Sequence, residues 1–206
     1  MAADAEASWD VGQAGPYTHL RVRILPDGGI ARLRAFGVAS DTLPFDAPTA
    51  LNGMAESEAV KALTRCCSSS RWVRAMCDMR PFTSRAHLFG AADSVWWHLD
   101  QRDWLEAFDG HPKIGASKAK GWSEGEQAGM ASAEQGVRSA ISELNTAYQN
   151  RYGYIYIVCA TGLSAAEMLA RLEHRMSNTP ENELRIAAGE QAKISRIRLT
   201  KLLEET

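Results

Sequence analysis

Residues 111–127 read His111-Pro-Lys-Ile-Gly-Ala-Ser-Lys-Ala-Lys-Gly-Trp-Ser-Glu-Gly-Glu-Gln127, and the rest of the chain is organised around this stretch. The residues before it, 100–108, are predicted to form a helix that Gly110 stops. Pro112 then disfavours the helical region for His111, so this histidine has little backbone freedom. Because His111 follows a helix C-terminus, whose dipole favours imidazolium, we expect its pKa to be raised.

Three polar side chains lie at the start of the next predicted helix. Ser123 begins this helix, and Glu126 and Gln127 lie within one turn of it. The helix can therefore present three polar groups to His111, which a different segment holds, and this is the outline of an acid–base site. The Ser123-x-x-Glu126 spacing also fits a capping box, and taken alone it favours that structural role.

The composition is that of an ordinary globular protein. The chain has 206 residues, 45% of them hydrophobic and 23% charged, with a formal net charge of −2. This length allows one good core or at most two small domains. Neither the charge nor its distribution points to nucleic acid or to an anionic membrane, and no apolar run approaches the length of a membrane span.

The cysteines and the chain ends bear on the compartment. Cys66, Cys67, Cys77 and Cys159 include no C-x-x-C pair, so free thiols in a reducing compartment are the simplest interpretation. The N-terminus lacks the pattern of a signal peptide, and the C-terminus is not a peroxisomal Ser-Lys-Leu tripeptide. We expect a cytoplasmic protein, with the peroxisome as the alternative.

Residues 1–45 differ from the rest of the chain. Apolar residues alternate with arginines over 20–24, and a Pro-Asp-Gly-Gly turn at 26–29 separates them from a further apolar run at 30–36. This pattern predicts a β-hairpin. Two strands alone are marginally stable, so the segment must pack on something or stay loosely ordered. We treat it as a unit separate from residues 46–206.

Helical periodicity dominates from residue 46 onward. Seven helices without an internal repeat are predicted, which makes this part of the chain a compact all-α domain. A short apolar run at 154–159 could be extended. The predicted helices cover residues 55–66, 70–79, 84–99, 100–108, 123–152, 164–176 and 179 to the C-terminus.

The last predicted helix carries Arg198 on its apolar face. An arginine there is costly unless it is paired or faces a polar cavity. Two interpretations stay open, a functional one and a structural one in which Arg198 reaches the surface or bridges to a carboxylate in the core. The other residues on this face are Leu184, Ala187, Ala188, Gln191, Ile194 and Leu202.

Eight short motifs occur in the order Ser70-Arg-Trp72, Arg80-Pro-Phe82, Trp104-Leu-Glu-Ala-Phe108, His111-Pro-Lys-Ile-Gly115, Trp122-Ser-x-x-Glu126-Gln127, Arg151-Tyr-Gly153, Arg175-Met-Ser-Asn178 and Lys193-Ile-x-x-Ile-Arg198-Leu199. With these motifs, residues 46–206 resemble the family of 2-oxo-4-hydroxy-4-carboxy-5-ureidoimidazoline (OHCU) decarboxylases of purine degradation. Tyr152 and Tyr156 stand where relatives commonly have phenylalanine, and neither belongs to the acid–base residues.

The resemblance implies a compact all-helical fold, a homodimer, and a reaction that needs neither metal nor organic cofactor. It also implies that His111 and Glu126 are the catalytic pair. The residues implied to bind the small ureidoimidazoline substrate are Ser123, Gln127, Arg198 and Pro112.

The implied chemistry suits these residue types. Loss of CO₂ leaves an electron pair that the ring carbonyl of the substrate can accept, so no pyridoxal or thiamine cofactor is required. Oriented donors from Arg198 and Gln127 would stabilise the developing enolate, and one such donor contributes about 3 kcal/mol. His111 and Glu126 would share a proton relay, and delivery of the proton to one face would give (S)-allantoin.

A second resemblance concerns residues 17–37, which are similar to the end of an allantoicase jelly-roll domain. So short a match cannot form a jelly roll, so we expect no allantoicase activity and treat His19 as a strand residue. Residues 1–45 would then be a remnant or the tail of a fused polypeptide. The edge of the hairpin could pair with another protein, such as an allantoicase of the same pathway.

Two competing interpretations remain. In one, the chain is a catalytically inactive helical module that binds a ureide or a partner protein, although the joint presence of an acid, a base and a buried cation argues against this. In the other, the chain is a metal hydrolase, although the histidine spacing fits no metal-binding motif. Its ligands would be drawn from His87, His98, His111 and His174, with Glu126.

Overall fold

The computed structural model describes residues 46–114, 125–126, 128–130 and 133–205. Every regular element in this part of the chain is a helix, which confirms the predicted all-α fold. The hairpin expected within residues 1–45, with His19, lies outside the described residues. The elements are α1 (Thr49–Gly53), α2 (Glu56–Cys66), α3 (Ser70–Asp78), α4 (Arg85–His98), α5 (Gln101–Asp109), the 3₁₀ turn η1 (Ala128–Met130), α7 (Gln135–Tyr152), α8 (Ala165–Arg175) and α9 (Pro180–Glu205).

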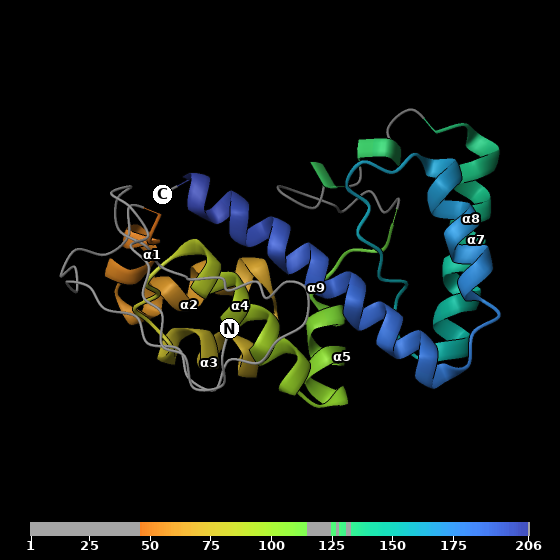
Figure 1. Ribbon diagram of the computed structural model, residues 1–206. Coiled ribbons are helices and arrows are strands. Elements are labelled where there is room, and N and C mark those ends of the chain that lie inside the picture. Colours follow the sequence, from red (N-terminus) through yellow and green to blue (C-terminus); the bar gives the residue numbers. More distant parts are fainter. Residues whose placement is uncertain (1–45, 115–124, 127, 131–132, 206) are drawn as a thin grey trace, which may run out of the picture.

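The long helix α9 is the axis of the molecule. Figure 1 shows it running past the other helices, with α2–α5 along its C-terminal part and the α7–α8 pair at its N-terminal end. Helices α2, α4 and α5 pack directly on α9, whereas α3 packs on α2, α4 and α5, and α7 packs on α8. A side chain on α9 can therefore meet groups from both halves of the fold.

Small residues on α9 allow α4 to approach closely. Ala187 and Ala188 are fully buried, and the indole Nε1 of Trp96 donates a hydrogen bond of 2.9 Å to the carbonyl of Ala188. Trp72 likewise donates from Nε1 to the carbonyl of Ala92 at 3.1 Å. Both buried indoles thus have a partner for their only polar group, which removes the penalty of burying it.

A buried polar network joins α7, α8 and α9. The carboxylate of Glu183, which is fully buried, accepts hydrogen bonds from Arg175 Nε at 2.7 Å, from Asn178 Nδ2 at 2.6 Å and from the hydroxyl of Tyr148. A buried carboxylate is tolerated only when it is paired and hydrogen-bonded in this way. The network therefore fixes where the α7–α8 pair meets the start of α9.

Two helix predictions need correction. The five-residue α1 was not predicted, because it is too short to show a helical period. The helix predicted over 123–152 is interrupted: among the described residues Met130 belongs to η1, and α7 begins only at Gln135. Glycines at 125 and 129 lower helix propensity there. The run at 154–159 forms neither helix nor strand.

Local side-chain and backbone features fix several helix ends. Asp100 caps α5 by accepting a hydrogen bond from the Arg102 backbone N–H at 2.9 Å, and Ser164 with Glu167 forms a capping box on α8. Gly153, with φ of 82°, ends α7 in the left-handed conformation that favours glycine. In the described part of the chain, no helix is long and apolar enough to cross a membrane.

Candidate active site

His111 is carried by the turn that ends α5. Its backbone N–H donates to the carbonyl of Phe108 at 3.0 Å, and Pro112 follows at once. Gly110 ends the helix as predicted, but with φ of −74° it does so outside the left-handed region. A Cβ atom at this position would lie 2.1 Å from Oγ of Ser68, so glycine is required here by close packing. The turn, and with it the imidazole, is thereby held against the N-terminus of α3.

Glu126 and Arg198 form a two-point ion pair. Arg198 Nε lies 3.0 Å from Glu126 Oε1, and Arg198 Nη2 lies 2.8 Å from Oε2. The residues are only 8% and 6% exposed, so each charge compensates the burial of the other. Lys201, one turn further along α9, places its Nζ 3.6 Å from Glu126 Oε1. The structural and the functional interpretation of Arg198 are compatible, because the buried carboxylate with which it pairs belongs to Glu126, itself a candidate site residue.

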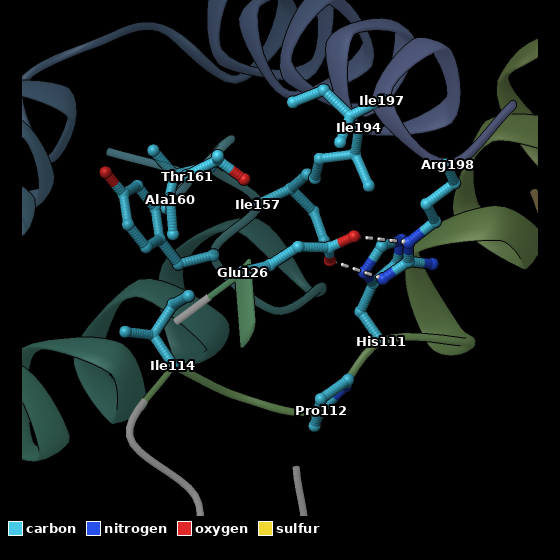
Figure 2. Close-up of a pocket in the computed structure, with 12 residues that line it drawn as sticks. His111, Pro112, Ile114, Glu126, Ile157, Ala160, Thr161, Ile194, Ile197 and Arg198 are labelled. Atoms are coloured by element: carbon cyan, nitrogen blue, oxygen red, sulfur yellow. Dashed lines mark hydrogen bonds and ion pairs between the residues drawn. The ribbon is translucent and has the colours of Figure 1, made fainter. Parts of the chain in front are cut away.

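One pocket brings these groups together. Figure 2 shows His111, Glu126 and Arg198 converging on it from three segments of the chain, with Pro112 at its edge. Its empty volume is about 420 Å³, including solvent at the mouth. The polar groups stand on one side, and most of the remaining lining is apolar. The apolar part of this lining consists of Ile114, Ile157, Val158, Ala160, Ile194 and Ile197.

One wall of the pocket is built from residues within 156–161, which form no regular element. Two buried charged side chains hold this backbone from outside the pocket. Arg175 Nη1 donates to the carbonyl of Ile157 at 2.6 Å, and Glu190 Oε2 accepts from the backbone N–H of Cys159 at 2.7 Å. The sequence analysis did not predict that Arg175 and Glu190 hold this backbone. Two features pointed to these residues: Arg175 lies in the motif Arg175-Met-Ser-Asn178, and Glu190 directly precedes Gln191, which lies on the inward face of α9.

The predicted pKa shift of His111 was wrong in direction. Burial lowers the pKa of the imidazole from 6.5 to about 4, and the positive charge of Arg198 acts in the same sense. The side chain of Gln191 and the charge of Glu126 oppose this shift without cancelling it. The expected effect of the helix dipole is weaker than desolvation. His111 is therefore neutral near pH 7 and has a lone pair available to accept a proton.

Four of the six site residues predicted from the sequence lie in the same pocket. His111, Pro112, Glu126 and Arg198 all line the pocket. Ser123 and Gln127 lie outside the described residues. Among the residues that the structure describes, no group of three His, Cys, Asp or Glu side chains could hold a metal ion, so the metal-hydrolase interpretation gains no donor set there.

Comparison with known proteins bears on the family. A family model described as OHCU decarboxylase matches residues 52–200. The chain belongs to the OHCU decarboxylase family. A model of the allantoicase repeat matches residues 1–40. Both resemblances predicted from the sequence are thereby confirmed.

Known proteins with similar sequences match part of this chain and part of their own length. The Arabidopsis thaliana uric acid degradation bifunctional protein TTL is 36% identical over 149 residues, which are 68% of this chain and 46% of that protein. The Mus musculus 2-oxo-4-hydroxy-4-carboxy-5-ureidoimidazoline decarboxylase is 37% identical over 89 residues, which are 43% of this chain and 50% of that protein. The chain spans about half the length of these curated relatives.

A solved structure of the OHCU decarboxylase family has the same fold. The crystal structure of OHCU decarboxylase in the presence of (S)-allantoin matches with a TM-score of 0.64 at 33% identity, covering 73% of this chain and 99% of that one. The match supports the helical arrangement that surrounds the pocket.

Proposed function

We propose that the chain catalyses decarboxylation of OHCU to (S)-allantoin and CO₂ in urate degradation. The observation that carries this proposal is the convergence of a neutral imidazole, a carboxylate and a guanidinium on one pocket in a member of the OHCU decarboxylase family. An acid–base pair beside a fixed cation is what removal of CO₂ and replacement by a proton require.

The electron flow follows from the structure of the substrate. Carbon 4 carries the hydroxyl and carboxylate groups and carbon 2 is the ring carbonyl, so the ring double bond must join carbon 5 to nitrogen. When the bond from carbon 4 to the carboxylate breaks, CO₂ leaves and the electron pair enters the ring. There it is accepted by the C=N group conjugated with the carbonyl at carbon 2. The substrate thus provides its own electron sink, which supports a reaction independent of cofactor and metal.

His111 is the base in this proposal. Its pKa of about 4 leaves the imidazole unprotonated near pH 7, so it can take the proton of the hydroxyl group at carbon 4. That transfer turns the C–OH of the enol intermediate into the ring carbonyl of allantoin. The resulting imidazolium lies in the field of Glu126, whose charge favours the protonated imidazole. Glu126 thus stabilises or relays the proton in transit.

Two proton transfers complete the reaction. The ring nitrogen that accepted the electron pair takes a proton from water, and the proton that His111 removed from the hydroxyl group is delivered to carbon 5. This carbon becomes the stereocentre of allantoin, so a proton arriving from one side of the ring gives one enantiomer. The side chains of His111 and Glu126 both point into the pocket, with the Glu126 carboxylate on the side of the imidazole and Arg198 (Figure 2). A substrate ring bound in the pocket would receive its proton on the face turned toward His111 and Glu126.

Arg198 is proposed to stabilise the negative charge that develops on the ring. Its guanidinium already forms a two-point pair with Glu126, so it is oriented before substrate arrives. Ser123, Gln127 and Pro112 are proposed to complete the substrate-binding set. The apolar lining would surround the departing carboxylate and favour its loss as neutral CO₂, because a carboxylate is poorly stabilised where it is desolvated.

The test is circular dichroism of urate oxidation products, coupled through hydroxyisourate hydrolysis, with and without the protein. We expect faster appearance of optically active allantoin with the wild-type chain. His111→Asn should slow it by roughly 100- to 10,000-fold, while His174→Asn, a change at an exposed histidine on α8, should leave it unchanged. Near-normal turnover by His111→Asn on freshly generated substrate would overturn the assignment of the base.

The alternative is a catalytically inactive module that binds a ureide or another protein. It predicts no change in either the rate or the enantiomeric excess of allantoin formation. Saturable binding of (S)-allantoin by calorimetry, together with such an absence of catalysis, would favour it.

Three further features belong to the same proposal. We propose a homodimer, for which the exposed Trp97 and Ile186, at 46% and 41% exposure, offer apolar surface.

The four free cysteines support a reducing compartment, with the cytoplasm favoured over the peroxisome. We also propose that residues 46–206 form the decarboxylase domain and that residues 1–45 are an allantoicase-like remnant, with an allantoicase as the pathway partner. Sedimentation velocity, alone and with an allantoicase, tests both assembly states.

A further inference from the structure

Gln191 is a buried polar residue that the proposed reaction does not yet use. It lies on the inward face of α9, seven residues before Arg198, and has no exposed surface. Its amide oxygen, Oε1, is buried and has no hydrogen-bond partner among the described residues. A buried carbonyl oxygen without a partner costs free energy, so one that persists next to a reactive group calls for an explanation.

The orientation of this amide is set from behind by Ser195. Gln191 Nε2 donates to Ser195 Oγ at 3.1 Å. The Ser195 oxygen is the acceptor in this bond, which is the role that the amide N–H₂ needs. Gln191 and Ser195 are both buried, so this contact is shielded from water.

The Gln191 side chain also lies near the imidazole of His111. The Gln191 side chain is within hydrogen-bonding reach of His111 and acts to favour its protonated form. With the N–H₂ group turned toward Ser195, the group available to His111 is the acceptor Oε1. The charged groups that bear on the same imidazole are Arg198 of α9 and Glu126.

We propose that Gln191 is the positioning residue of His111: its amide oxygen accepts the N–H of one ring nitrogen and so leaves the lone pair of the other nitrogen directed into the pocket. The proposal deepens the proposed function, on which the role of His111 as base rests. When His111 takes the substrate hydroxyl proton, both ring nitrogens carry hydrogen. Gln191 holds one of them throughout, and the other returns to the substrate. Gln191 exchanges no proton itself.

Two substitutions separate positioning from packing. Gln191→Leu keeps the approximate volume and removes the acceptor, whereas Gln191→Glu keeps the acceptor and adds a charge. For Gln191→Leu we expect kcat to fall by roughly 10- to 100-fold with KM little changed. For Gln191→Glu we expect the acidic limb of the pH–rate profile to move to higher pH, because a carboxylate beside the imidazole stabilises imidazolium. Ser195→Ala, which frees the amide to turn while keeping Gln191, should give a smaller loss of kcat.

A spectroscopic readout tests the inference independently of catalysis. In ¹⁵N-histidine-labelled protein, ¹⁵N–¹H correlation spectra report which ring nitrogen of His111 carries the proton. We expect one tautomer in the wild type and a mixture in Gln191→Leu, with the other four histidines as internal controls. An unchanged tautomer with unchanged kcat in Gln191→Leu would overturn the inference. If the wild type makes no allantoin, the proposed function fails, while the tautomer spectra still decide the role of Gln191. Should Gln191→Leu fail to fold, Gln191→Glu and Ser195→Ala provide the same two readouts.

Discussion

At the scale of single residues, the protonation of His111 shows how burial overrides local backbone geometry. The dipole at the end of α5 favours imidazolium, yet burial lowers the pKa of His111 from the ordinary value of 6.5 to about 4. Desolvation acts on the whole charge of the imidazolium, whereas the dipole of a nine-residue helix ending in solvent contributes less. A sequence shows the dipole but not the burial, so the sign could not be predicted from it.

This lowered pKa makes stability depend on pH. Between pH 4 and 6.5 the unfolded chain carries a proton on His111 that the folded chain lacks, so unfolding takes up a proton. Stability is therefore complete above pH 6.5 and decreases as the pH falls toward 4, by about 2 kcal/mol between pH 7 and pH 5. Urea denaturation at both pH values checks this. His111→Asn should flatten the difference by that amount and the exposed-site control His174→Asn should not; equal slopes in both would contradict it.

The ion pair between Glu126 and Arg198 allows a second prediction at this scale. Among the described residues, Arg198→Met leaves the buried carboxylate of Glu126 with Lys201, 3.6 Å away, as its remaining cation, so we expect a loss of about 3–5 kcal/mol in the free energy of unfolding. Glu126→Gln should also destabilise. The double substitution should cost less than the sum of the two, since it removes both charges together.

The matched control for this prediction is Arg196→Met on the same helix. Arg196 pairs with Asp93 at 3.5 Å, but the two side chains are 56% and 50% exposed. Its loss should change stability by only about 0.5 kcal/mol. Chemical denaturation measures all four variants, and strict additivity in the double variant would show that the two charges do not depend on each other.

At the scale of elements, the sequence predicted helices well where an apolar stripe and a cap coincide. The Asp100 and Ser164 caps and the buried face of α9 belong to this class. The sequence is less informative where tertiary contacts replace local periodicity. The run at 154–159 contains aromatic and β-branched residues and could be extended, yet no strand in the described part of the chain pairs with it, and side chains from α8 and α9 hold it instead.

The clearest test at this scale is Arg175→Met on α8. Removing the guanidinium leaves the Glu183 carboxylate buried with fewer partners and frees the carbonyl of Ile157. We expect a loss of about 3 kcal/mol in stability. We also expect a higher KM in allantoin formation, because Ile157 lines the pocket. Arg171→Met, an exposed change on the same helix, is the control; equal effects of the two substitutions would contradict a role for the buried network.

At the scale of the whole molecule, the candidate site depends on residues that are distant in sequence. Glu126 and Arg198 are 72 positions apart, and His111 comes from a third segment. Sequence patterns placed each of them on its own element, and the family resemblance implied that they act together. The partner of Arg198 could not be predicted from spacing, because it depends on how α9 lies against the segment that carries Glu126.

The boundary between residues 45 and 46 allows a prediction for the whole chain. The residues that the structure describes between 46 and 205 bury a core that runs from Leu51 at 0% exposure to Leu202 at 2%, and the OHCU decarboxylase family model spans 52–200. We therefore expect a chain of residues 46–206 to fold by itself, with the cooperativity and thermal midpoint of the full chain. Calorimetry and the circular dichroism assay of allantoin formation measure this. A lower midpoint would show that residues 1–45 stabilise the domain. An unchanged midpoint with lost activity would show that they contribute to the site, and either result would end the interpretation of the segment as a remnant.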